Sequence, residues 1–108
     1  MASTTQTAQV ILDDGEFYVV LNPNHTPDVA AGYLERRCLV TPSTPGGFEC
    51  IGSFTMQPAG AWEAKISKVY SAVDDCDCTV VAQEVDRLAA IVALWKARYE
   101  AFVGYHTL

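Results

Sequence analysis

The most regular hydrophobic pattern of this chain lies between Thr79 and Val103, in the sequence TVVAQEVDRLAAIVALWKARYEAFV. Apolar residues recur there at alternating intervals of four and three, a spacing that places them on one face of an α-helix. They are Val81, Val85, Leu88, Val92, Trp95, Tyr99 and Phe102. The pattern predicts one long amphipathic helix over residues 79–103, with this stripe packed against the rest of the fold.

Both ends of this segment carry residues that are typical of helix boundaries. Asp77 or Thr79 can act as the N-cap, and the neighbouring aspartates favour the positive end of the helix dipole. Gly104 follows the last apolar residue of the pattern, where a C-terminal glycine is common.

The opposite side of the predicted helix is lined mainly with alanine. Because alanine is the best helix former, the simpler interpretation is that this side needs no partner. The alternative is a flat surface on which a helix from a second copy or from another protein packs closely. On that hypothesis the candidate interaction residues are Ala90, Ala93, Leu94, Ala97 and Ala101.

The rest of the chain alternates β-rich runs with turn residues. Residues 9–12 and 16–21 flank Asp13-Asp14-Gly15, and Asp-Gly between two such runs is a hairpin signal. Further strands are predicted at residues 37–41, 48–55 and 61–72, the last with a helix as the alternative. Thr26-Pro27 is typical of a helix start, which favours a short helix from Pro27 to about Glu35.

The predicted fold class is therefore α+β. An antiparallel sheet of about five strands is covered on one face by the long C-terminal helix, with the short helix optional after strand two. Residues 9–108 form a single domain, preceded by a flexible tail of residues 1–8. The strand residues expected in the core are Val10, Leu12, Phe17, Val19, Leu21, Leu39, Phe54 and Ile66.

Composition narrows the kinds of partner. Half of the 108 residues are apolar and 19% are charged, which is typical of a globular domain. The net charge of −6 and the seven basic residues disfavour nucleic acid. No run reaches the roughly 18 apolar residues that span a membrane, and the polar N-terminus does not resemble a secretion signal. We therefore expect a cytoplasmic protein with reduced cysteines.

Residues 74–78 form the densest cluster of metal-ligand types. Cys76, Asp77 and Cys78 are the candidate ligands, and His25 or His106 could complete a zinc shell. Zinc sites usually carry two cysteine pairs with two residues inside each pair, a spacing that this cluster lacks. The favoured interpretation is therefore an acidic helix start, and no cofactor is expected. Cys38 and Cys50 could form a disulfide on oxidation if their strands pair.

Motifs for catalysis are absent from the sequence. It contains no nucleophile elbow, Walker loop, dinucleotide fingerprint or His-Glu-x-x-His, which favours a binding protein over an enzyme.

The preferred hypothesis is a small protein-interaction module that binds an unidentified protein, or a second copy, through the alanine side or a sheet edge. Trp62 either closes one end of the sheet or joins that surface. The alternative is a small-molecule or metal-binding protein, with its site between sheet and helix or at the Asp/Cys cluster.

Overall fold

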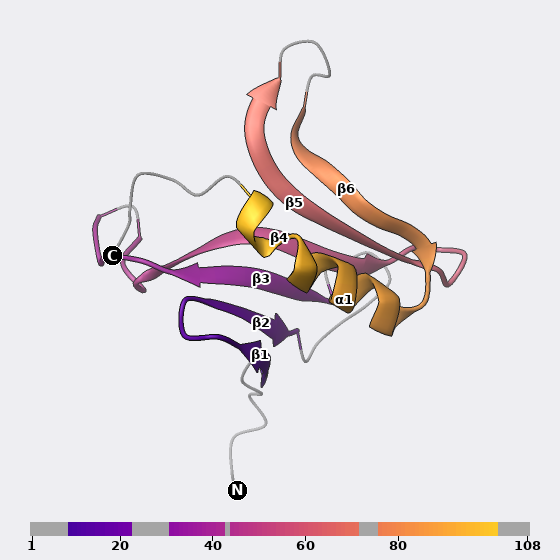
Figure 1. Cartoon of the computed structure of the whole chain (residues 1–108), viewed down its shortest axis with the longest axis horizontal. Helices are drawn as coiled ribbons and strands as arrows, with labels where there is room; N and C mark the ends of the chain where they lie inside the picture. Colours follow the sequence, from indigo (N-terminus) through magenta and orange to yellow (C-terminus); the bar gives the residue numbers. More distant parts are fainter. Residues whose placement is uncertain (1–8, 23–30, 43, 72–75, 102–108) are drawn as a thin grey trace, which may run out of the picture.

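The chain folds as one antiparallel sheet followed by one helix (Figure 1). The computed structural model describes residues 9–22, 31–42, 44–71 and 76–101. Six strands lie in chain order across the sheet, so each strand pairs with its sequence neighbours. They are β1 (Gln9–Asp13), β2 (Phe17–Leu21), β3 (Gly32–Arg37), β4 (Phe48–Met56), β5 (Trp62–Ser71) and β6 (Cys76–Val85). Helix α1 (Arg87–Lys96) and the 3-10 turn η1 (Arg98–Glu100) follow. The predicted α+β class is confirmed.

The β1–β2 hairpin turns at the predicted Asp13-Asp14-Gly15. The carboxylate of Asp13 accepts a hydrogen bond from the Gly15 N–H at 2.8 Å, and that of Asp14 accepts one from the Phe17 N–H at 2.7 Å. Gly15 has a φ of 98°, a conformation that glycine adopts without steric cost. The strand predictions for residues 48–55 and 61–72 are confirmed by β4 and β5.

The helix predicted over residues 79–103 is wrong in its first part. Residues 76–85 are the strand β6, and α1 begins only at Arg87 with Asp86 as its N-cap. Four of these strand residues are β-branched, which favours a strand: Thr79, Val80, Val81 and Val85. Three of them, Thr79, Val80 and Val85, pair directly with residues of β5. Neither Asp77 nor Thr79 is a helix cap, and Gly104 lies outside the described residues.

The short helix predicted from Pro27 to Glu35 is also wrong where the structure describes it. Residues 32–37 form β3, which pairs with β2 and β4, and the strand predicted at 37–41 thus lies earlier in the chain. A Cβ at Gly32 would lie 2.3 Å from the ring of Phe54, so only glycine permits this close pairing. Residues 27–30 lie outside the described part.

The core lies between the sheet and α1, which contacts β4, β5 and β6. A bulge places Ile51 between Cys50 and Gly52, so that Ile51 and Phe54 are both buried. Of the predicted core residues, Phe17, Val19, Phe54 and Ile66 are buried, and Leu12 and Leu21 are partly buried. Val10 and Leu39 are exposed, because Val10 lies on the edge strand β1 and Leu39 lies beyond the end of β3. No helix among the described residues is long and apolar enough to cross a membrane.

Candidate functional site

Helix α1 packs on the sheet through its alanine side. Ala90, Leu94 and Ala97 are only 0%, 0% and 6% exposed. Leu94 lies directly over Gly52, where an added Cβ would be 2.8 Å from its Cδ1 atom. The small alanine side chains let the helix axis approach the strands closely.

The predicted orientation is therefore wrong for Leu88 and Val92, which are exposed, whereas Val81, Val85 and Trp95 of the predicted stripe do pack against the core. Ala90, Leu94 and Ala97 belong to the core of this chain and cannot present a surface to a partner. Ala93 and Ala101 are partly buried, and Ala101 packs against the same core.

Large apolar side chains occupy the outward side of the helix instead. Leu88, Val92 and Tyr99 are 70%, 41% and 68% exposed, and Trp95 between them is partly buried. We call Leu88, Val92, Trp95 and Tyr99 the outer stripe. Viewed down the helix axis, successive residues are about 100° apart. In this projection the apolar residues occupy an arc of roughly 220°, with Ala97 at one edge and Val92 at the other. The sheet covers the part of this arc centred on Leu94, Trp95 is partly buried against the same core, and Leu88, Val92 and Tyr99 stay exposed.

Arg98 fixes the C-terminal end of the outer stripe to the β1–β2 turn. Its guanidinium stacks on the rings of Trp95 and Tyr99, at 4.1 and 4.6 Å from their centroids. Its Nε donates to Asp14 at 2.9 Å, and its Nη1 donates to the carbonyl of Trp95 at 2.7 Å. These contacts hold the two aromatic rings in place.

Tyr99 is held from two further directions. Its hydroxyl lies 3.4 Å from the Asp14 carboxylate, and its ring meets Phe17 edge-on at 5.1 Å. Burial raises the pKa of Asp14, but hydrogen bonds from the N–H groups of Phe17 and Glu16 and from Arg98 outweigh it and leave the pKa below its usual 3.8. Asp14 is therefore ionised at neutral pH and keeps its bond to Arg98.

Trp62 closes one end of the core. It is the first residue of β5, it is partly buried, and its ring lies 6.1 Å from that of Phe54. The guanidinium of Arg87 lies over it at 5.9 Å. A role for Trp62 in binding a partner stays a prediction.

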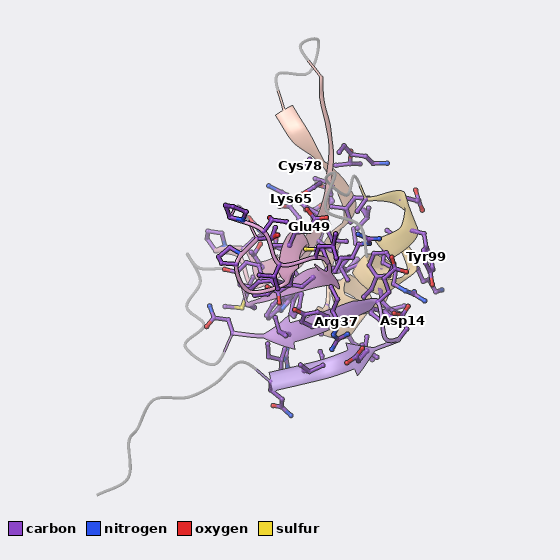
Figure 2. All side chains as sticks on the ribbon, turned by 90° about the vertical axis from the view of Figure 1, so that its left-hand side faces the viewer. Asp14, Arg37, Glu49, Lys65, Cys78 and Tyr99 are labelled. Atoms are coloured by element: carbon purple, nitrogen blue, oxygen red, sulfur yellow. The ribbon has the colours of Figure 1, made fainter. Side chains whose placement is uncertain are left out.

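A hollow of about 240 Å³ lies on the back face, the face of the sheet opposite α1. Tyr33, Ser53 and Lys65 stand side by side there on β3, β4 and β5. Together with Cys50, Ser67 and Cys78 they line the hollow. In Figure 2, Lys65 and Cys78 lie away from the side that carries α1, Asp14 and Tyr99. The hollow thus differs in place from the predicted pocket between sheet and helix.

The Cys50 thiol of the hollow is a poor nucleophile, and it cannot form a disulfide with Cys78. Desolvation raises the pKa of Cys50, whose thiol donates a hydrogen bond to the Gly52 carbonyl at 3.4 Å. A raised pKa leaves less thiolate at neutral pH. Cys50 and Cys78 lie on β4 and β6 with β5 between them. Two strand spacings of about 4.8 Å separate their backbones by roughly 10 Å, beyond the reach of a disulfide.

The weak metal candidates are not brought together by the described residues. Cys78 is exposed on β6, and the side chains of Cys76 and Asp77 are not described. His25 and His106 lie outside the described part of the chain. Within that part, no group of three or more His, Cys, Asp or Glu side chains could hold a metal ion. The explanation of the cluster as a helix start is wrong, because residues 76–85 are a strand.

The cysteines proposed as a disulfide pair are both free. Cys38 is buried just after β3, with its N–H donating to the Gly47 carbonyl at 2.8 Å. Cys50 is exposed and pairs with Glu35 across the β3–β4 ladder.

Comparison with known proteins supplies no function for this chain, since no family model, curated protein or solved structure matches it. The outer stripe and the hollow are the two candidate sites that the described residues present. The outer stripe exposes large apolar side chains held in place, which is typical of a protein-binding surface. The hollow is smaller than the usual ligand pocket of about 300–1,000 Å³.

Proposed function

We propose that this protein is a non-enzymatic interaction module that binds a protein partner through the outer stripe of α1. The observation that supports it is the exposure of Leu88 and Val92 on α1 and of Tyr99 on the η1 turn that follows. Single exposed apolar residues are ordinary on protein surfaces, whereas a contiguous row of them is typical of a binding site. The spacing of the stripe, four, three and four residues, is that of a seam between two helices.

Several titratable groups with shifted pKa values are engaged with neighbours in the fold. Burial raises the pKa of Tyr18 to about 12, and burial also raises the pKa of Glu35, whose carboxylate accepts a hydrogen bond from Tyr18. Asp13 and Asp14 have lowered pKa values, the first through its bonds to Arg37 and Gly15.

The proposal keeps the location and partner class expected from the sequence. In the cytoplasm the thiols of Cys38, Cys50 and Cys78 would stay reduced. With a net charge of −6, an apolar protein surface is a better partner than a nucleic acid.

A photo-crosslinking amino acid at position 92 tests this function in the cell. We expect a discrete crosslinked product, because a partner on the outer stripe covers this position. Val80 is the matched control, since it is also a valine, is 42% exposed and lies on the back face of β6. A product at position 80 and none at position 92 would rule out the outer stripe as the binding surface.

A second candidate function is the binding of a small molecule in the hollow. Tyr33, Ser53 and Lys65 line it, and the Lys65 ammonium group forms an ion pair with the Glu63 carboxylate at 3.4 Å. Native mass spectrometry of untreated protein would then show the added mass of a bound molecule. Ser53→Trp fills the hollow and should abolish this added mass. A spectrum of the bare chain alone would exclude this candidate.

A further inference from the structure

We draw no further inference here: the strongest candidate, the hollow on the back face of the sheet, belongs to the second candidate function already described, and its Lys65, whose ammonium group is paired with the Glu63 carboxylate, selects no particular class of ligand.

Discussion

At the scale of single residues, Gly52 determines how closely α1 approaches the sheet. A Cβ there would lie 2.8 Å from Leu94 Cδ1 and 2.9 Å from the Lys65 carbonyl oxygen. Gly52→Ala should therefore lower the free energy of unfolding by roughly 1–3 kcal/mol, measured by urea denaturation. The neighbouring Ser53→Ala lies on the back face and should change it by less than about 0.5 kcal/mol. Equal losses in the two variants would contradict the close packing.

Asp14 links stability to pH. Its pKa is lower in the folded chain than its usual 3.8, because the Phe17, Glu16 and Arg98 hydrogen bonds outweigh the effect of burial. The stabilisation is therefore complete above the unfolded pKa and is lost as the pH falls through the folded pKa. Asp14→Asn should be less stable at pH 7 and should show a shallower loss of stability below about pH 4. Thermal melts from about pH 2 to 7 measure this, and parallel curves for the two proteins would contradict it.

Some residue-level features could be predicted from the sequence and others could not. The Asp-Gly turn depends on its own side chains, which accept the bonds that form the turn, so its residues are enough to predict it. The roles of Gly32 and Gly52 depend on what faces them from β2, β4 and α1. Those neighbours are set by register, which the sequence of a single strand does not reveal.

At the scale of elements, the boundary between β6 and α1 lies at Asp86. Its carboxylate accepts a hydrogen bond from the Ala89 N–H at 2.7 Å, so Asp86→Ala should cost about 1 kcal/mol of folding stability. Thr79, the cap expected from the sequence, lies inside β6 and is exposed. Thr79→Ala should cost only about 0.5 kcal/mol or less in the same denaturation experiment. A larger cost at Thr79 than at Asp86 would indicate that the helix begins earlier.

Irregularity in β6 explains why its sequence resembles a helix. β6 carries one extra residue on each side of Ala82 in its ladder with β5, and Glu84 has a φ of 55°. Such bulges break the alternation of inward and outward residues that identifies a strand. The four-residue interval between Val81 and Val85 then matches a helical spacing by coincidence.

The orientation of α1 could not be predicted, because both of its sides are apolar. A stripe of large residues usually marks the buried side of a helix. Here Gly52 leaves room for Leu94, and Ala90 and Ala97 let the helix lie close to the strands. The bulky outer stripe would hold the helix farther from the sheet, so the alanine side packs inward.

At the scale of the whole molecule, the α+β class followed from the sequence because its main signals are independent of register. Turn residues separate the β-rich runs, and an apolar helix follows the last of these runs. A sheet covered by a helix is the simplest fold that buries the apolar faces of both the sheet and the helix. The number of strands and the covered side of the helix depend on long-range packing. The candidate sites follow from that packing, which is why the outer stripe and the hollow were not predicted.

The most direct test of the structure compares one substitution at two positions of α1. Leu94 is fully buried against Gly52, whereas Leu88 is 70% exposed. In chemical denaturation at low micromolar concentration, Leu94→Ala should lower the free energy of unfolding by about 2–5 kcal/mol, and Leu88→Ala by less than about 1 kcal/mol. The reverse order would show that the stripe of large residues faces the sheet, and would contradict both the packing of α1 and the outer stripe as a binding surface.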